Sequence, residues 1–261
     1  MVGDLRRSGD PQAVLNERCD ILRALHVPHL PLVLPNAWDV ASAHAVDVAG
    51  FPVVATTSAG VAASLGYEDG EDAPAAEMFA AAGRIARSVN LPVTVDAEAG
   101  YGLAPHDLVD ALRDVGAAGC NLEDTDHATG RLAGAGAHAE WLRAVRAAAD
   151  DRDYRLVINA RADVFIRQEQ QTRPELIDEA IARARLYLAA GADCVYPILL
   201  HDAGIIRAFI ESVQAPVNIL AIPAAPSIAE LTELGVARIS YGSLIHRRTM
   251  QDLTAYLEGL Q

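Results

Sequence analysis

Short apolar runs alternate with longer amphipathic stretches along almost the whole chain, and this alternation limits the fold more than any other feature. The short runs have the length of buried strands, whereas the longer stretches carry apolar residues three and four positions apart, the spacing of one helix face. Strands that take turns with helices predict a parallel sheet. The strand-like runs are 31–35, 52–56, 92–96, 119–123, 155–160, 193–198, 217–222 and 237–242.

The number and spacing of these units predict how the sheet closes. Because eight evenly spaced strand–helix units make up the chain, we expect an α/β fold, a (β/α)8 TIM barrel that forms one domain over residues 1–261. An extra N-terminal helix is expected at 10–27. A doubly wound open sheet is the alternative, and the even spacing favours closure. The helical stretches that follow the strands are 40–50, 74–89, 105–119, 138–151, 174–191, 204–214, 226–235 and 245–260.

The charged residues exclude several classes of function. Thirty-five acidic and 21 basic residues give a net charge of −14, which argues against nucleic acid as a partner. All 21 basic residues are arginine, so the chain contains no lysine. Schiff-base, pyridoxal and P-loop mechanisms depend on a lysine, so any electrophilic work must come from a metal, an arginine or backbone amides.

Neither the cysteines nor the N-terminus indicates export. Cys19, Cys120 and Cys194 lack the spacing of a disulfide framework or a zinc site, and the last two fall inside strand runs, where we expect them to be buried. The first residues are polar, and no apolar run reaches the roughly 18 residues that span a bilayer. We therefore expect a cytoplasmic protein with no membrane partner.

Acidic side chains gather where the third and fourth predicted strands end. Asp96 and Glu98 are two positions apart and share one face of an extended backbone, and Glu123 ends the neighbouring strand. Active sites of such barrels lie at these strand ends. Three converging carboxylates require a divalent cation, and ligands that are all oxygen suit Mg²⁺ or Mn²⁺. Arg161, at the end of the fifth strand, could pair with a substrate carboxylate or phosphate.

Other polar residues at the strand ends have weaker claims. TTSAG, with Thr57 and Ser58, offers a hydroxyl and accessible amides, although a tight turn into a helix explains it equally well. Asp39 is expected to cap a helix. His127 and His138 flank a loop rich in glycine and alanine, and one of them could act as acid or base if that loop covers the site. Glu123 and the residue after it could instead belong to a solvated loop.

Five stretches in this order resemble the isocitrate lyase/phosphoenolpyruvate mutase superfamily over about residues 35–243: TTSAGVAASLGYEDG, VTVDAEAGYG, GAAGCNLEDT, NARADVF and GADCVYP. The resemblance implies a (β/α)8 barrel that binds Mg²⁺ and makes or breaks C–C or P–C bonds beside a 2-oxo acid or enolate. It implies that Asp96 ligates the metal directly, while Glu98 and Glu123 hold it through its waters.

The same resemblance assigns the substrate-binding residues. It implies that Ser58 and the backbone amides of Ala59 and Gly60 bind the substrate carboxylate, next to Thr57. It implies that Arg161 contacts substrate oxygens. The candidate catalytic residues are then Arg161, Asp69 and Glu123, with Asp69 matching a family aspartate at the edge of the site.

The loop at 124–138 departs from the named members of the superfamily. Isocitrate and methylisocitrate lyases carry a KKCGH-like motif here, whose cysteine is the acid, and phosphonopyruvate-forming mutases carry a Lys–Asn pair. This chain has LEDTDHATGRLAGAGAH, with neither motif. It therefore resembles a phosphonomutase-like member without the lyase cysteine. Members also embrace a neighbour through extra C-terminal helices, for which little sequence remains, so a homo-oligomer stays an open alternative.

These observations favour one function and leave two alternatives. The first hypothesis is a Mg²⁺-dependent enzyme, acting on a small 2-oxo or 2-hydroxy carboxylate through a metal-stabilised enolate, with C–C cleavage by a lyase or decarboxylase. The second is a mutase or hydrolase of a P–C bond. The third is a barrel that binds a carboxylate metabolite without catalysis.

Overall fold

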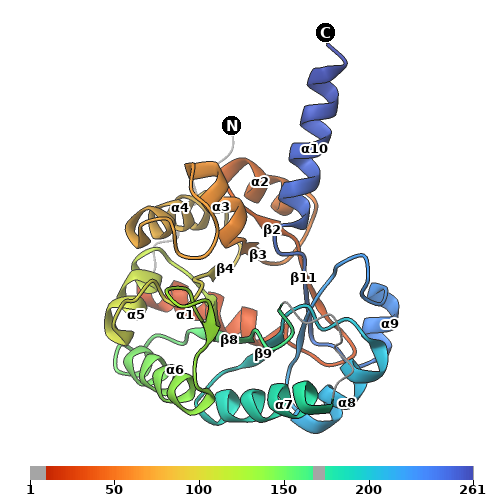
Figure 1. The fold of residues 1–261 in the computed structure, drawn as a ribbon. Coiled ribbons are helices and arrows are strands. Elements are labelled where there is room, and N and C mark those ends of the chain that lie inside the picture. Colours follow the sequence, from red (N-terminus) through yellow and green to blue (C-terminus); the bar gives the residue numbers. More distant parts are fainter. Residues whose placement is uncertain (1–9, 167–173, 261) are drawn as a thin grey trace.

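The computed structural model describes residues 10–166 and 174–260. A ring of parallel strands lies at its centre, and helices surround the ring (Figure 1). The strands of the ring are β1 (Leu32–Leu34), β2 (Asn36–Ala37), β3 (Val54–Thr56), β4 (Val93–Asp96), β5 (Gly119–Glu123), β8 (Val157–Ala162), β9 (Cys194–Pro197), β10 (Asn218–Leu220) and β11 (Arg238–Ser240). A strand is present at each of the eight predicted places.

The strands form a closed barrel. One sheet has the order β2-β3-β4-β5-β8-β9 and a second the order β1-β11-β10. The bridge between Val195 and Val217 joins β9 to β10, and β1 continues into β2 across Pro35. The predicted (β/α)8 fold is therefore confirmed, and the open-sheet alternative is wrong.

The buried side chain of Asn36 completes the seam between the two sheets. Its Nδ2 donates to the carbonyl of Thr56 at 2.7 Å, and its Oδ1 accepts from the backbone N–H of Tyr241 at 2.9 Å. Pro35 has no N–H to offer a neighbouring strand, so the amide of the next residue supplies the bonds that a regular ladder would make. The Asn36 side chain thus helps to close the barrel between the two sheets.

The helices follow the predicted order, with one addition. The extra N-terminal helix is confirmed, and a further short helix, α3, begins directly after β3, where TTSAG had allowed a turn into a helix. The helices are α1 (Pro11–Ala24), α2 (Val40–Val48), α3 (Ser58–Leu65), α4 (Ala75–Ser88), α5 (Pro105–Asp114), α6 (Ala135–Asp150), α7 (Pro174–Ala189), α8 (Ala203–Val213), α9 (Ile228–Glu233) and α10 (Leu244–Glu258). Within the described ranges, no helix is long and apolar enough to cross a membrane.

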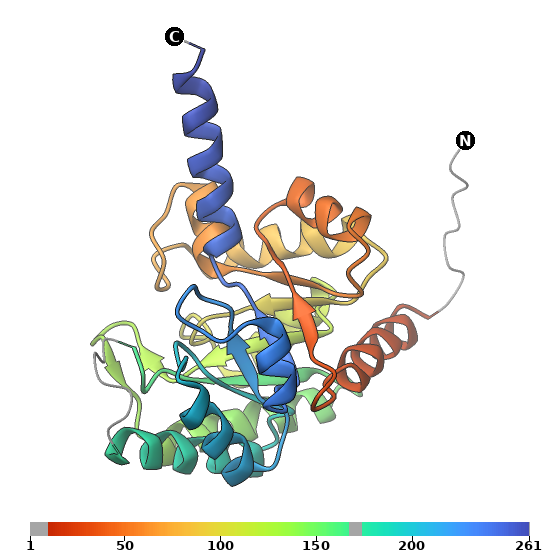
Figure 2. The same cartoon turned by 90° about the vertical axis from the view of Figure 1, so that its right-hand side faces the viewer.

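Two elements depart from the simple barrel. The loop after β5 contains an antiparallel hairpin of β6 (Thr125–Asp126) and β7 (Arg131–Leu132). The last helix, α10, extends away from the barrel instead of packing along it, as Figures 1 and 2 show. Asp39 caps α2, as expected, and accepts from the N–H of Ser42 at 2.7 Å.

Each strand divides its side chains between two environments. Along β4 and β5, Val95, Cys120 and Leu122 are buried in the core cluster shared with the surrounding helices. The neighbouring residues along these strands, which include Asp96 and Glu123, lie on the opposite face, because successive side chains of a strand alternate between the two faces. All three cysteines are free and buried. The apolar layer therefore fixes which polar side chains enter the barrel mouth.

A substitution of Gly119, at the start of β5, would test how closely the core is packed. A Cβ there would lie 2.7 Å from the backbone oxygen of Val157 and 2.7 Å from Leu22 Cδ2. We expect Gly119→Ala to lower the free energy of unfolding by about 1–3 kcal/mol, since the strand carbonyl cannot move aside. Gly136→Ala in α6 is the control, because a Cβ there meets nothing within 4 Å and should stabilise by roughly 0.5–1 kcal/mol. Urea denaturation measures both, and equal effects would contradict the packing argument.

Candidate active site

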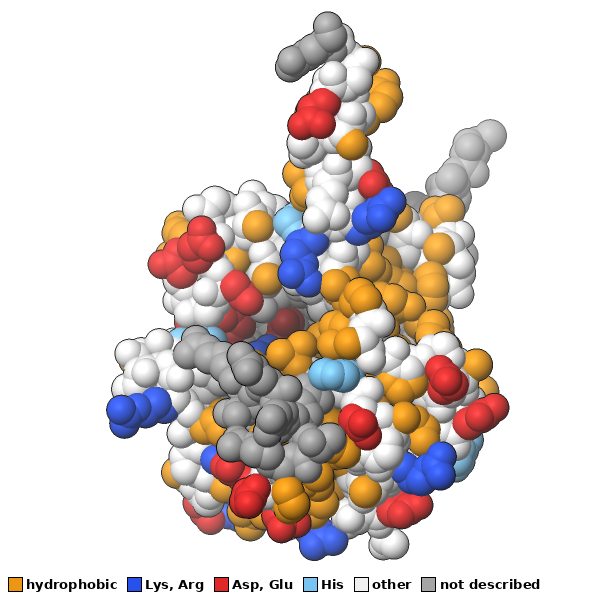
Figure 3. Space-filling view, turned by 45° about the vertical axis from the view of Figure 1, so that its right-hand side comes forward, with side chains coloured by type: hydrophobic (Ala, Val, Ile, Leu, Met, Phe, Trp, Pro, Cys, Tyr) orange, Lys and Arg blue, Asp and Glu red, His pale blue; other side chains and the backbone are white. Residues whose placement is uncertain are grey.

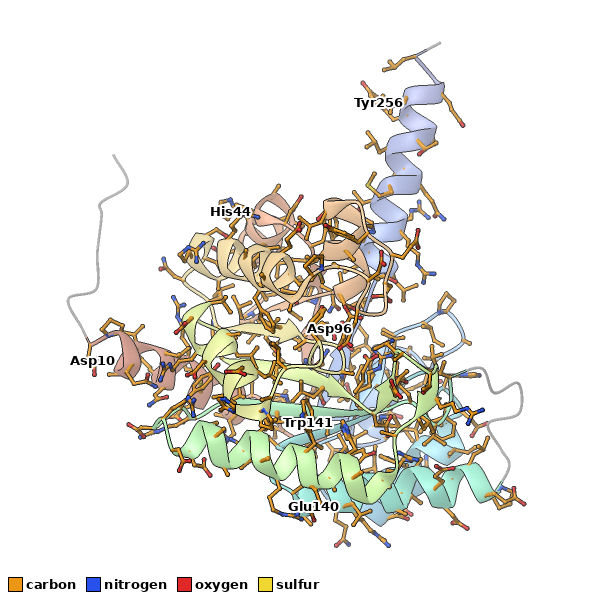
Figure 4. All side chains as sticks on the ribbon, turned by 60° about the vertical axis from the view of Figure 1, so that its left-hand side comes forward. Asp10, His44, Asp96, Glu140, Trp141 and Tyr256 are labelled. Carbon is orange, nitrogen blue, oxygen red and sulfur yellow. The ribbon has the colours of Figure 1, made fainter. Side chains whose placement is uncertain are left out.

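Asp96, the last residue of β4, has one carboxylate oxygen in use and one without a partner. The backbone N–H of Ser58 donates to Oδ2 at 3.2 Å, and the N–H of Asp96 itself donates to Thr56 Oγ1 at 2.9 Å. Oδ1 is buried and has no hydrogen-bond partner among the described residues. A buried carboxylate oxygen without a donor is unfavourable. Figure 4 shows Asp96 within the ring of strands, the place expected of a metal ligand.

The N-terminus of α3 lies beside Asp96. Because Ser58 is the first residue of this helix, the N–H groups of Ser58, Ala59 and Gly60 have no helical carbonyl before them. The N–H of Ser58 donates to Asp96, whereas those of Ala59 and Gly60 can receive an anion. A Cβ on Gly60 would lie 2.7 Å from Thr57 Cγ2 and 3.0 Å from Trp38 Cβ, so only glycine fits. The TTSAG segment is therefore both the turn into a helix and a set of accessible amides.

A buried arginine lies between two carboxylates at the ends of β5 and β8. Glu123 pairs with Arg161 in the strand register, and Arg161 Nη1 is 2.5 Å from Glu123 Oε2. On its other side, Arg161 Nε donates to Asp163 Oδ1 at 2.6 Å and Nη2 donates to Asp163 Oδ2 at 3.2 Å. Burial would lower the pKa of Arg161, but the two carboxylates outweigh it and raise the pKa. The arginine therefore stays charged in the barrel mouth.

Asp163 is in turn held by the start of the loop that follows β5. Thr125 Oγ1 donates to Asp163 Oδ2, and the N–H of Asp163 donates to Asp124 Oδ1 at 2.8 Å. Asp124 also accepts from Tyr187 at 2.6 Å and from Arg183 at 3.0 Å. Glu123 and Asp124 are 3% and 1% exposed, so the alternative of a solvated loop is wrong for both.

The β6–β7 hairpin brings His127 to the same carboxylate. His127 Nε2 lies 2.7 Å from Glu123 Oε1. Burial raises the pKa of Glu123 to about 7, against the lowering effect of Arg161. The hydrogen bond to Glu123 raises the pKa of His127 above its ordinary value. The two groups are hydrogen-bonded to each other, so they titrate as a pair.

Glu98 is nearly inaccessible, at 2% exposed, and its oxygens face protein donors. Oε2 accepts from the N–H of Gly70 at 3.0 Å and from that of Glu71 at 2.7 Å, and Oε1 accepts from the Tyr101 hydroxyl at 2.7 Å. Burial is the largest cause that raises the pKa of Glu98 to about 7, and the bond from Tyr101 opposes it. Both carboxylate oxygens of Glu98 therefore accept hydrogen bonds from the protein, whereas only one of those of Asp96 does within the described part of the chain.

A cavity of about 550 Å³ opens over the arginine. Figure 3 shows acidic side chains in a hollow near the base of α10. Asp69, which the sequence placed at the edge of the site, lines the cavity, whereas Asp96 and residues 57–60 are not in its lining. The lining residues are Asp69, Gly70, Glu123, Thr125, His127, Gly130, Leu132, Arg161, Asp163, Val164 and Ile166.

The structure brings together most of the predicted site and adds residues to it. Asp96 influences the titration of Asp69, Glu98 and Glu123, so these carboxylates lie near each other. Within residues 10–166 and 174–260, however, no three His, Cys, Asp or Glu side chains are arranged to hold a metal ion together. A metal here would therefore have one direct carboxylate ligand and reach the others through water, an arrangement that the free oxygen of Asp96 fits.

Sequence reasoning left three residues of the site without a role and one open. Asp163 lies just after the fifth predicted strand, and like Tyr101 and Thr125 it stands in a motif that carries the family resemblance. His127 was one of two candidates, and the structure places it at Glu123. His138 instead lies in α6, where it is buried and stacks on Trp141 with ring centroids 5.5 Å apart. A histidine four residues after a strand-end glutamate was the available signal.

The fold and the site together define a TIM-barrel protein whose polar cluster lies at the C-terminal strand ends, the position of active sites in this class. Residues 22–261 match the phosphoenolpyruvate phosphomutase family. The chain belongs to this family, and with it to the isocitrate lyase/phosphoenolpyruvate mutase superfamily that its motifs resemble.

Relatives within this group carry different activities in their names. An uncharacterized protein of Mycobacterium tuberculosis H37Rv is 37% identical over 221 residues, 84% of this chain and 81% of the relative. A Corynebacterium glutamicum protein named probable 2-methylisocitrate lyase 2 is 34% identical, covering 88% of this chain and 71% of the relative.

Two solved structures show the same fold. A Burkholderia cenocepacia J2315 protein, provisionally described as a phosphonomutase, is 41% identical with a TM-score of 0.90, covering 95% of this chain and 100% of the other. A 2,3-dimethylmalate lyase is 26% identical with a TM-score of 0.82, covering 93% of this chain and 84% of the other.

The buried His138 should give the stability a measurable pH dependence. Burial, and to a smaller extent Arg183, lowers the pKa of His138 to about 4. The unfolded chain binds the proton near pH ~6.5, so the free energy of unfolding should fall as pH falls from there toward 4. His138→Phe keeps an aromatic ring against Trp141 and should reduce this fall. Urea denaturation at pH 4.5 and 7 measures it, and an unchanged pH dependence would contradict a neutral buried histidine.

Proposed function

We propose that this protein is a Mg²⁺-dependent enzyme that cleaves a C–C bond of a small 2-oxo or 2-hydroxy carboxylate through an enolate. The observation that carries the proposal is the buried, unpartnered Oδ1 of Asp96, beside a charged arginine and at the C-terminal mouth of a barrel. A lyase or a decarboxylase fits this description.

The donors fit Mg²⁺, and Mn²⁺ as its substitute. Asp96 would hold the ion through Oδ1, and Glu123 would accept a hydrogen bond from its water, because oxygen ligands and retained waters suit these ions. When bound, Mg²⁺ would polarise the 2-oxo group and stabilise negative charge on the enolate oxygen. With no lysine in the chain, an iminium route is not available.

The residues of this chain would bind and orient the substrate. Ser58 and the N–H groups of Ala59 and Gly60 would donate hydrogen bonds to its carboxylate at the start of α3. Arg161, fixed by Glu123 and Asp163, would direct its remaining N–H groups toward substrate oxygens in the cavity. The barrel fixes the backbone that carries these N–H groups before the substrate binds. This lowers the entropic cost of ordering them on binding.

Proton transfer would fall to the pair of His127 and Glu123. Their hydrogen bond of 2.7 Å lies at the cavity wall, and burial raises the pKa of Glu123 to about 7. A group that titrates near neutral pH can both take and return a proton.

The named relatives support C–C cleavage and also leave P–C chemistry open. Relatives at 34% and 26% identity are named as lyases. The alternative is a P–C mutase or hydrolase, which the family name and the provisional phosphonomutase favour. Phosphorus NMR of phosphonopyruvate distinguishes the two, because a lyase leaves that signal unchanged. A barrel that binds a metabolite without catalysis would turn over no member of a 2-oxo acid panel.

Asp96→Asn tests the metal assignment. The substitution keeps the size of the side chain and removes its charge, so we expect Mg²⁺ affinity to fall by more than tenfold in calorimetry. Oxalate, which mimics the pyruvate enolate, should then no longer bind in the presence of Mg²⁺. Asp39→Asn, at the α2 cap, is the matched control and should bind Mg²⁺ normally. Undiminished Mg²⁺ binding by Asp96→Asn would disprove the assignment.

We further propose that the partner is a small carboxylate in the cytoplasm rather than nucleic acid. The net charge of −14 repels a phosphate backbone. The three buried free cysteines are compatible with a reducing compartment.

We also propose a homo-oligomer formed through α10. This helix extends from the barrel (Figure 2), and residues 244–258, all within the described part, include none that is buried. Met250, Leu253, Leu257 and Leu260 are 44–66% exposed and follow each other by three, four and three positions, the spacing of a helix–helix contact. A second copy of this chain would remove this apolar stripe from water.

Charges placed on the stripe should break the oligomer. We expect the double variant Leu253→Asp/Leu257→Asp to elute as a monomer in light-scattering chromatography, because two carboxylates cannot be buried in an apolar contact. Ala255→Asp, on the opposite side of α10, is the control and should keep the native mass. A monomeric native protein would contradict this proposal and leave the proposal for the active site unaffected.

A further inference from the structure

Three residues that are not glycine adopt left-handed backbone angles beside the barrel mouth. They are Glu71, Glu98 and Tyr101, with φ of 63°, 47° and 56°. This conformation is unfavourable for a residue with a Cβ, and it persists only where surrounding contacts impose it. The three belong to two loops, 68–72 and 97–102, that meet each other.

Hydrogen bonds among these residues form a closed set, which we name the Glu98 clamp: Gly70, Glu71, Glu98 and Tyr101. Glu98 Oε2 accepts from the N–H groups of Gly70 and Glu71, and Glu98 Oε1 accepts from the Tyr101 hydroxyl. Glu71 Oε1 accepts from the N–H of Tyr101 at 2.5 Å. Each loop therefore holds the other, which accounts for the strained angles.

The clamp uses most of what the Glu98 carboxylate can offer. A carboxylate accepts about four hydrogen bonds, and three protein donors lie within 3.0 Å of this one. His127 Nε2, at 4.0 Å from Oε2, is too far to be a fourth. Asp96, two residues earlier, keeps one oxygen with no partner among residues 10–166 and 174–260. The two carboxylates of this strand end thus have different surroundings.

We propose that Glu98 is a positioning residue, which anchors the loop 68–72 over the barrel mouth and does not contribute to metal affinity. Asp69 lies in this loop directly before the two amides that Glu98 holds, and it lines the cavity. The inference rests on the proposed function only for the presence of a metal.

A second contact shows where the anchored loop lies. A Cβ on Gly70 would be 3.3 Å from His127 Nδ1, so the loop passes close against the imidazole that bonds to Glu123. Gly70 has a φ of 96°, which glycine adopts readily. The clamp therefore fixes the position of Asp69 and also holds the loop against the Nδ1 side of the His127 ring.

The experiment compares three variants by two measurements: Mn²⁺ affinity from electron paramagnetic resonance, and amide hydrogen exchange of the segment 68–72. Tyr101→Phe keeps the ring and removes one donor of the clamp. We expect exchange at Gly70 and Glu71 to accelerate by about tenfold, with Mn²⁺ affinity within about threefold of the native value. Glu98→Gln should show the same pattern with faster exchange.

Asp96→Asn is the opposite case, with Mn²⁺ affinity lowered by more than tenfold and exchange of 68–72 unchanged. A fall in Mn²⁺ affinity for Glu98→Gln as large as that for Asp96→Asn would overturn the inference, as would native exchange rates in Tyr101→Phe. If Asp96→Asn binds Mn²⁺ normally while the other two variants accelerate exchange, the proposed metal site fails and the anchoring role stands.

Discussion

A buried arginine between two carboxylates organises the mouth of this barrel. Arg161 requires both Glu123 and Asp163, because a guanidinium removed from water is stable only when its charge is balanced. Each carboxylate has its own support: Glu123 bonds to His127, and Asp163 is held by Thr125 and the backbone. The hairpin after β5 therefore depends on the ion cluster for its position, and the cluster depends on the closed strand register that pairs Glu123 with Arg161.

In the segment VTVDAEAGYG, two carboxylates that are two positions apart have different hydrogen-bond partners. Asp96 ends a regular strand, with one oxygen held by the N–H of Ser58 and the other unpartnered. Glu98 follows in a left-handed conformation, and its longer side chain reaches the amides of the neighbouring loop. One carboxylate is thus available to a cation, whereas the other is largely committed to protein donors. Only two positions separate these residues, but their surroundings differ because the strand ends between them.

The loop that distinguishes this chain from the named lyases is ordered by polar contacts. Arg183 of α7 bonds to Asp124 and to the carbonyl of Ala133 at the end of the hairpin. These bonds fix the two ends of 124–133, so His127 between them is held against Glu123. An imidazole and a buried carboxylate therefore lie together at the wall of the cavity.

The sequence by itself determined the barrel and the acidic and arginine residues of its mouth. Apolar periodicity is local, and the alternation of strand side chains places Asp96, Glu123 and Arg161 without further information. Only the tertiary structure decided that His127 meets Glu123, that Tyr101 binds Glu98 and that α10 leaves the barrel. Such contacts join loops or depend on what a helix face finds to cover it, and no periodicity in the sequence encodes either. The proposed metal ligand could therefore be expected from the strands, whereas the contacts that hold Glu98 and His127 could not.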